Sequence, residues 1–172
     1  MPCRPVGDKK PVLEAGVWLA PGAWLSGEVF LSERVNVWDG AVIRGDLAPI
    51  RIGRETNIQD AVVLHVDDDF PLTIGARCTV GHSAILHGCD IEDEVLIGMA
   101  SIVMNGARIG RGSLIAAGAL VREGSVIPPF SLVAGLPARI LRQLPEEETL
   151  EERAASVERY LSMVAAHEGA QP

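Results

Sequence analysis

The chain has 172 residues, a formal net charge of -8 at pH 7 and no run of Lys or Arg, which argues against a nucleic-acid partner because phosphate binding needs a basic face. No apolar stretch is long enough to cross a bilayer, and residues 1–12 lack the apolar block of a signal peptide, so we expect no membrane association. The three cysteines, an odd number, argue against a disulfide framework and indicate a cytoplasmic location.

Aliphatic residues recur at every sixth position along most of the chain. Neither a helix period of 3.6 nor strand alternation produces this spacing, whereas short parallel strands separated by Gly-containing turns do. With 48% hydrophobic but only 4% aromatic residues, the composition fits a narrow core filled by aliphatic side chains. The first series comprises Leu13, Leu19, Leu25, Leu31, Val37 and Ile43, and the second comprises Ile91, Ile97, Val103, Ile109, Ile115, Val121, Ile127 and Val133.

The period of six is interrupted three times between the two series. Three residues are inserted near positions 48–50, four are inserted at 66–71, and one is missing between Leu86 and Ile91. Insertions in a repeat protein form protruding loops and often mark its functional face. Three of the four histidines, His65, His82 and His87, lie among these interruptions.

The repeat ends after Pro137 and gives way to a helical pattern. Pro145 is followed by three glutamates, as is typical of a helix start, and apolar residues then recur at helical spacing. The pattern predicts a helix over about 145–166, packed along the outside of the repeats. We therefore divide the chain into a region of repeats at 1–144 and a C-terminal helical segment at 145–172, with a frayed end at 169–172.

The period resembles that of the hexapeptide-repeat proteins, whose fold is a left-handed parallel β-helix of triangular cross-section. The handedness and the three faces follow from this resemblance. Three hexads then make one coil, and side chains one coil apart stack about 4.8 Å from each other. A run of β-hairpins or a β-sandwich is the alternative architecture.

The register of the repeats stacks two of the histidines. His65 and His87 each follow a first-face anchor by one residue, so they lie in neighbouring coils below Arg44, and both imidazoles can converge on one ion. A two-imidazole site of this kind suits Zn²⁺, although nitrogen ligands do not distinguish zinc from Fe²⁺ or Co²⁺.

His82 follows a third-face anchor by two residues and so emerges elsewhere on the triangle, where Asp60 stacks on it and Gln59 lies beside it. It cannot complete the same site within its own chain. Packing the first-face edge of one copy on the third-face edge of the next would bring the histidines together. Such a heterologous contact closes as a ring of three, which predicts a homotrimer.

Several motifs over residues 15–142 resemble the γ-class carbonic anhydrase family. They are VWDGAVIRGDLAPIRIGRETNIQD, LHV, TVGH, LHGC, LIGM, VMNGA, SLIAAGALV and LVAGLPAR. In that family, three histidines bind zinc, iron or cobalt between the subunits of a trimer, and they match His65, His82 and His87, with His82 lent by the adjoining subunit. The resemblance implies a lyase whose metal-bound hydroxide attacks CO2 to give bicarbonate.

The resemblance also assigns roles to residues around the ion. Arg44 and Asp46 match an intersubunit ion pair, and Gln59 matches the residue that orients metal-bound solvent. The family places a tyrosine from the C-terminal region near the metal, which here is Tyr160. Asn57 and Asp60 are either turn residues or supports of the ligands; the stacking of Asp60 on His82 favours support, since a ligating imidazole donates its free N–H.

The chain departs from the family pattern where a proton must leave the site. Leu47 occupies the place of an acidic residue that follows RGD in the archetypal enzyme, and the loop at 66–71 is short. Asp67, Asp68 and Asp69 are acids that could carry the proton instead. The departure bears on the rate of turnover more than on metal binding.

Three other functions fit the same scaffold. Relatives with the same histidines resemble acyl-CoA thioesterases, in which the hydroxide would attack a thioester. A hexapeptide acyltransferase would use one histidine as a base but would not need three converging imidazoles. A binding or assembly protein with weak or no catalysis is the third. Cys78 and Cys89 are expected to be packing residues, and His167 a residue of the tail without function.

Overall fold

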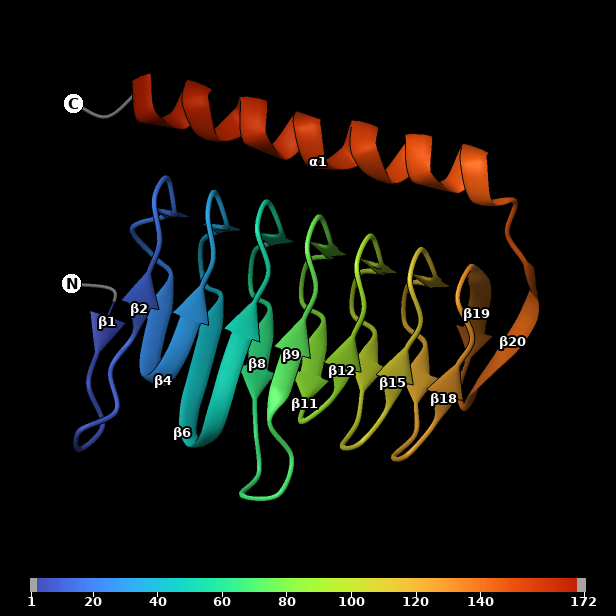
Figure 1. Ribbon diagram of the computed structural model, residues 1–172, viewed down its shortest axis with the longest axis horizontal. Coiled ribbons are helices and arrows are strands. Elements are labelled where there is room, and N and C mark those ends of the chain that lie inside the picture. The colour runs from blue at the N-terminus through green and yellow to red at the C-terminus, as the bar shows by residue number, and fades with distance from the viewer. Residues whose placement is uncertain (1–2, 170–172) are drawn as a thin grey trace.

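The computed structural model describes residues 3–169, which form a parallel β-helix covered along one side by a C-terminal helix (Figure 1). Each coil contributes one strand to each of three faces, as the period of six predicts. The buried anchors fill the interior, and the twelve largest fully buried side chains are all Leu or Ile. Among the residues described, no helix is long and apolar enough to cross a membrane.

The first and second faces form one continuous sheet because two long strands bend around the corner between them. These strands are β4 (Trp24–Leu31) and β6 (Val42–Ile52). β4 pairs with β6 and with the short N-terminal strands β1 (Cys3–Arg4) and β2 (Val12–Leu13), and β6 pairs with the later coils. The first face continues through β8 (Val63–His65), β11 (Ile85–His87), β14 (Ile102–Val103) and β17 (Leu120–Val121), and the second through β9 (Leu72–Ile74), β12 (Asp90–Ile91), β15 (Arg108–Ile109) and β18 (Val126–Ile127).

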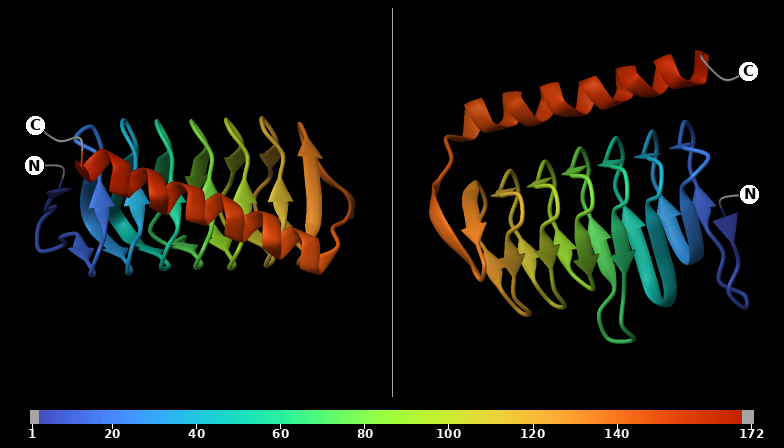
Figure 2. Two further views of the ribbon diagram at one scale, coloured as in Figure 1. Left: turned by 90° about the horizontal axis from the view of Figure 1, so that it is seen from above. Right: turned by 180° about the vertical axis from the view of Figure 1, so that it is seen from behind.

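The third face is a separate sheet that lies beneath the C-terminal helix (Figure 2). Its parallel strands are β3 (Trp18–Leu19), β5 (Asn36–Val37), β7 (Asn57–Ile58), β10 (Thr79–Val80), β13 (Leu96–Ile97), β16 (Leu114–Ile115) and β19 (Ser131–Gly135). A last strand, β20 (Ala138–Gln143), pairs antiparallel with β19. The period of six ends at Pro137 and gave no indication of this closing strand.

The three interruptions of the period all have a structural counterpart. The first is a bulge in β6, where four residues at 46–49 lie opposite the single residue Glu28 of β4, slightly earlier than the predicted 48–50. The second is the 66–71 loop, closed by an antiparallel bridge between Asp67 and Phe70, which projects on the side opposite the helix (Figure 1). The missing residue produces a tight turn at Gly88, whose φ is +52°; a Cβ there would collide with Phe70.

The helix α1 (Glu146–Gly169) extends beyond the predicted end at residue 166. His167 therefore belongs to the helix, and the expectation that it lies in a tail is wrong. Its ring lies edge-on to Trp38 at 5.1 Å and to Trp18 at 5.9 Å between centroids, so aromatic packing holds the last turn on the third face. Of the predicted frayed end, Gly169 is helical and residues 170–172 lie outside the described part of the chain.

Two of the cysteines are packing residues, as expected. Cys78 and Cys89 are both buried in the interior cluster, and burial raises the pKa of the Cys78 thiol to about 12. Burial likewise raises the pKa of the Cys89 thiol. Neither thiol is therefore a nucleophile at neutral pH.

Replacing an anchor should destabilise the coil far more than replacing its surface neighbour. Ile109 is fully buried, whereas Val126, on the adjacent second-face strand, is 69% exposed. Ile109→Ala leaves a cavity and should lower the free energy of unfolding by about 3 kcal/mol, measured by denaturant titration. Val126→Ala should change it by less than about 0.5 kcal/mol. Equal losses in the two variants would contradict the assigned register.

Candidate metal centre

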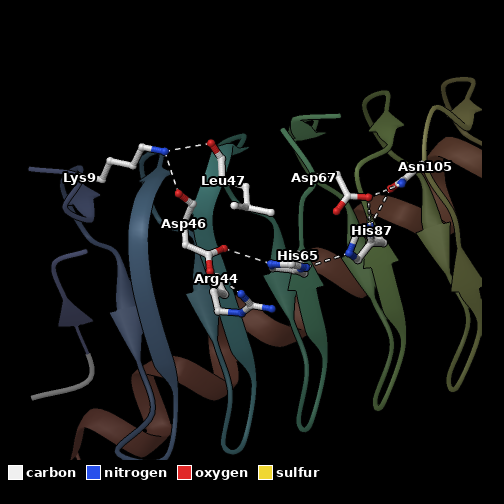
Figure 3. A network of polar contacts seen from close by, with 8 residues as sticks. All are labelled: Lys9, Arg44, Asp46, Leu47, His65, Asp67, His87 and Asn105. Atoms are coloured by element: carbon white, nitrogen blue, oxygen red, sulfur yellow. Dashed lines mark hydrogen bonds and ion pairs between the residues drawn. The ribbon is translucent and has the colours of Figure 1, made fainter. Parts of the chain in front are cut away.

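The first-face histidines lie in the register that the sequence predicts. Arg44 pairs with His65 across β6 and β8, and His65 pairs with His87 across β8 and β11. The three side chains thus form one column on neighbouring coils, close to the corner that carries the 66–71 loop (Figure 3). The period, together with the three faces implied by the resemblance to hexapeptide-repeat proteins, predicted this stacking.

A continuous chain of polar contacts runs through the column (Figure 3). Arg44 donates to Asp46, whose other oxygen lies 3.1 Å from His65 Nε2. His65 Nδ1 lies 2.8 Å from His87 Nε2. His87 Nδ1 in turn lies 2.7 Å from the side-chain oxygen of Asn105.

The acceptors at the two ends of the histidine pair fix both tautomers. The Asp46 carboxylate accepts from His65 Nε2–H. The Asn105 amide donates through its nitrogen to Asp67 at 2.7 Å, so its oxygen faces His87 and accepts from Nδ1–H. Two neutral imidazoles carry only two protons, and both are used in these outer contacts. The lone pairs of His65 Nδ1 and His87 Nε2 therefore face each other.

Facing lone pairs need a cation between them, which is either a proton or a metal ion. A proton is disfavoured because burial lowers the pKa of His65; Arg44 and His87 lower it further, and together they outweigh the opposing effect of Asp46. Burial would raise the pKa of Asp46, but hydrogen bonds from Arg44 and His65 hold it below its ordinary value, so Asp46 stays an anion. These residues fit a divalent metal ion ligated by two imidazole nitrogens.

The second group of expected site residues lies at the corner where the third face meets the first. His82 Nδ1 lies 2.9 Å from a carboxylate oxygen of Asp60. Gln59 accepts from the backbone N–H of His82 at 3.2 Å and donates to Asn57 at 3.0 Å, so its amide is held in one orientation. The predicted stacking of Asp60 on His82 is confirmed.

Tyr160 reaches the same corner from α1. With Gln59 and His82 it lines a groove of about 370 Å³ between the helix and the third face. Its ring packs edge-on against Trp38 at 5.5 Å between centroids, and burial, aided by the charge of Asp60, raises the pKa of its hydroxyl. Tyr160 is therefore both a packing residue and a neighbour of His82.

Within one chain the two groups do not meet. Over residues 3–169, no cluster of three or more His, Cys, Asp or Glu side chains is arranged to hold a metal ion. His65 and His87 lie at one corner of the coil and His82 lies at another, as the register argument predicted. A complete three-histidine site needs a second copy of the chain.

Two residues of the column were missed by the sequence analysis. Asn105 follows the anchor Val103 by two residues and reaches His87 because Gly88 turns the chain early. Lys9 donates to the backbone oxygens of Asp46 at 2.7 Å and Leu47 at 2.9 Å and so holds the bulge in β6. The register could have identified Asn105, since the missing residue brings it next to His87; no sequence signal points to Lys9.

Comparisons with known proteins match the repeat fold and identify similar proteins. Residues 71–99 and 88–123 match the family described as hexapeptide repeat of succinyl-transferase. The chain is 48% identical over 137 residues to the "Probable carbonic anhydrase" of Methanocaldococcus jannaschii, which covers 80% of this chain and 86% of that protein. It is 46% identical over 147 residues to a carbonic anhydrase of Geobacillus kaustophilus, covering 86% and 81%.

A plant relative is longer than this chain. Gamma carbonic anhydrase 1 of Arabidopsis thaliana, a mitochondrial protein, is 38% identical over 175 residues, which are 97% of this chain but only 63% of the plant protein. Among solved structures, a candidate acetyltransferase of Bacillus cereus superposes with a TM-score of 0.94 at 37% identity over 98% of each chain. A hexapeptide transferase family protein of Anaplasma phagocytophilum superposes with a TM-score of 0.88 at 34% identity over 95% of this chain and 96% of that chain.

The tautomer argument predicts the effect of removing Asn105. Asn105→Leu deletes the acceptor of His87 Nδ1–H, so His87 no longer presents Nε2 reliably, and metal affinity should fall by roughly 10- to 100-fold. Competition with a chromogenic chelator measures the loss. Asp67→Asn, which leaves the acceptor in place, is the matched control and should keep most of the affinity. Unchanged affinity in Asn105→Leu would contradict the assignment.

Proposed function

Since the chain belongs to the γ-class carbonic anhydrase family, we propose that it hydrates CO2 to bicarbonate and a proton at a metal ion shared between subunits of a homotrimer. The observation that carries the proposal is the 2.8 Å approach of His65 Nδ1 to His87 Nε2, while Asp46 and Asn105 accept from the outer nitrogens of the two rings. The three cysteines are free within residues 3–169, which supports the cytoplasmic location expected from the sequence.

The ion would be held by His65 Nδ1 and His87 Nε2 of one subunit and by His82 Nε2 of the next. Zn²⁺ suits three neutral imidazoles, and Fe²⁺ or Co²⁺ fits the same donors. When bound, the ion supplies Lewis-acid activation, which lowers the pKa of a water ligand to about 7. The contribution of the chain is to present three lone pairs and to fix their directions.

An exposed apolar column beside the histidines supports the trimer. The outward residues directly before the first-face anchors from Leu25 to Val121 are all apolar and stack in register from coil to coil. Trp24 is 41% exposed and Ile85 is 39% exposed, which is unusual for a continuous column on a monomer. A neighbouring copy packed there would bury the apolar column. It would also carry the corner with its own His82 toward His65 and His87 of this chain. The column comprises Trp24, Val42, Val63, Ile85, Ile102 and Leu120.

The other proposed site residues hold the ligands or the substrate. Asp46, itself held by Arg44, orients His65, and Asp60 lies 2.9 Å from His82 Nδ1, where it can support that ring. Gln59, kept in one orientation by Asn57, lines the groove next to His82 and can orient solvent or CO2 by hydrogen bonding. Tyr160 lines the same groove and offers a further hydroxyl. In this arrangement Arg44 acts by holding Asp46, and Asn57 acts by holding Gln59.

The proton released by hydration needs an acceptor, and Leu47 cannot provide one. Leu47 is exposed beside the histidine column (Figure 3). Asp67 lies 4.0 Å from His87 Nδ1, has a half-exposed side chain and adjoins Asp68 and Asp69. We therefore assign the first step of proton transfer away from the site to Asp67.

Mixed trimers test the shared site. His65→Ala and His82→Ala should each abolish CO2 hydration, followed by stopped flow, and tight metal binding. When the two variants are co-expressed with different tags, roughly a quarter of the interfaces pair an intact His65–His87 column with an intact His82. Metal content and CO2 hydration should reappear in proportion to the number of these complete interfaces.

A second mixture provides the control for this experiment. His65→Ala with His87→Ala should regain nothing, because neither chain has a complete column. Recovery in this control, or none in the first mixture, would contradict a site between subunits. Thioester cleavage or acyl transfer by metal-loaded wild-type protein that lacks CO2 hydration would replace the proposed reaction with the corresponding alternative.

The role of Asp67 predicts a distinct kinetic pattern. Asp67→Asn should lower kcat by roughly tenfold or more, because the variant cannot accept a proton, and leave kcat/KM nearly unchanged. Added imidazole buffer should restore kcat by carrying the proton in its place. A loss of both constants that imidazole does not restore would show that Asp67 supports the structure through Asn105 only.

A further inference from the structure

Lys9 lies in the N-terminal segment, yet its side chain reaches the bulge of β6 (Figure 3). Its ammonium group donates to the backbone oxygen of Asp46 at 2.7 Å and to that of Leu47 at 2.9 Å. These contacts join residues that are 37 and 38 positions apart in the sequence. The fold therefore places a cation from the start of the chain on the backbone of the residue that contacts His65.

The backbone of Lys9 is itself held in place. Its N–H donates to the oxygen of Val6 at 3.1 Å and its oxygen accepts from the N–H of Val6 at 2.9 Å, which closes a tight turn. The strands on the two sides of this turn, β1 and β2, pair with β4, the strand that also pairs with β6. The ammonium group therefore extends toward β6 from a fixed point, and less conformational freedom is lost on binding than for a lysine in a free terminus.

The part of β6 that Lys9 contacts is not paired in the sheet. Pairing of β4 with β6 stops at Gly45 and resumes at Ile50. On the opposite edge, β6 pairs with β8 as far as Arg44 and with β9 from Ile50 onward. Within the described chain the strand ladders thus leave residues 46–49 unpaired, and the two hydrogen bonds from Lys9 tie the start of this stretch to the N-terminal turn.

The position of this stretch matters because Asp46 is its first residue. The Asp46 carboxylate accepts from Arg44 and lies 3.1 Å from His65 Nε2. A rotation of the main chain at Asp46 would displace its carboxylate, and a hydrogen bond weakens steeply when its distance and angle change. Lys9 binds the C=O of the same residue, so it acts on His65 through Asp46.

We propose that Lys9 is a positioning residue of the proposed metal site. It holds the backbone of Asp46 and Leu47 so that the Asp46 carboxylate accepts from His65 Nε2–H, which leaves His65 Nδ1 for the ion. The effect on metal binding rests on the proposed function, whereas the contact between Asp46 and His65 belongs to the chain alone.

Zinc affinity, measured by competition with a chromogenic chelator, tests the proposal. Loss of a direct partner of a metal ligand typically weakens metal binding by 10- to 100-fold, and Lys9 acts one residue further out, so Lys9→Met should weaken zinc binding by roughly 3- to 10-fold. Loss of a positive charge by itself would favour a bound cation, so weaker binding reports the lost hydrogen bonds. Lys9→Arg keeps several N–H donors and should stay within about twofold of wild type.

Lys10→Met is the matched control, because it removes the neighbouring exposed charge and should bind zinc no more weakly than wild type. Crystal structures of metal-free wild type and Lys9→Met give a second readout that needs no ion. In the variant, the Asp46 carboxylate should leave His65 or divide between two conformations, while the β-helix is otherwise unchanged.

The two readouts separate this inference from the proposed function. If wild-type protein binds no metal, the proposed function fails and the crystal comparison alone decides the role of Lys9. If wild type binds zinc and Lys9→Met binds it as tightly as Lys10→Met, the proposed function stands and the role of Lys9 is overturned. An unchanged contact between Asp46 and His65 in the Lys9→Met crystals overturns it as well.

Discussion

The contact between His65 Nδ1 and His87 Nε2, 2.8 Å apart, is the constraint on which the account of the site depends. Asp46 and Asn105 each accept a proton from the outer nitrogen of one ring, so neither ring has a proton left for the contact between them. Neighbouring strands in a sheet come within about 4.8 Å, which brings two imidazoles on adjacent coils close enough to share a cation. The β-helix therefore supplies the spacing of the two rings. Four polar neighbours, Arg44, Asp46, Asn105 and Asp67, fix the directions in which their nitrogens point.

The same fold explains why the site remains incomplete in a single chain. Side chains on one face of the coil stack, but side chains on different faces point away from a common axis, so His82 cannot join the column of its own subunit. The partly exposed apolar residues before the first-face anchors lie beside that column, whereas the helix covers the third face. The proposed metal binding and the proposed subunit assembly would in this way follow from one geometry.

Much of the fold and of the histidine column could be predicted because a period of six leaves little freedom. Once the anchors are identified, the face and the coil of His65, His82 and His87 follow by counting, and the insertions shift the count by known amounts. The partner of His87 follows from the count only when the missing residue at Gly88 is taken into account, since Asn105 reaches His87 across this shortened turn. The closing strand β20 reverses direction, which a parallel period does not encode. The end of α1 depends on aromatic packing of His167 against Trp18 and Trp38, a tertiary contact that overrides local helix signals.

The most direct test of the central claim is anomalous diffraction from metal-loaded crystals at the zinc, iron and cobalt edges. We predict one ion for each pair of adjoining subunits, bonded to His65 Nδ1 and His87 Nε2 of one copy and to the imidazole of His82 from the other. An ion held by a single histidine, or a pair of rings that keep a hydrogen bond to each other while the metal sits elsewhere, would contradict it.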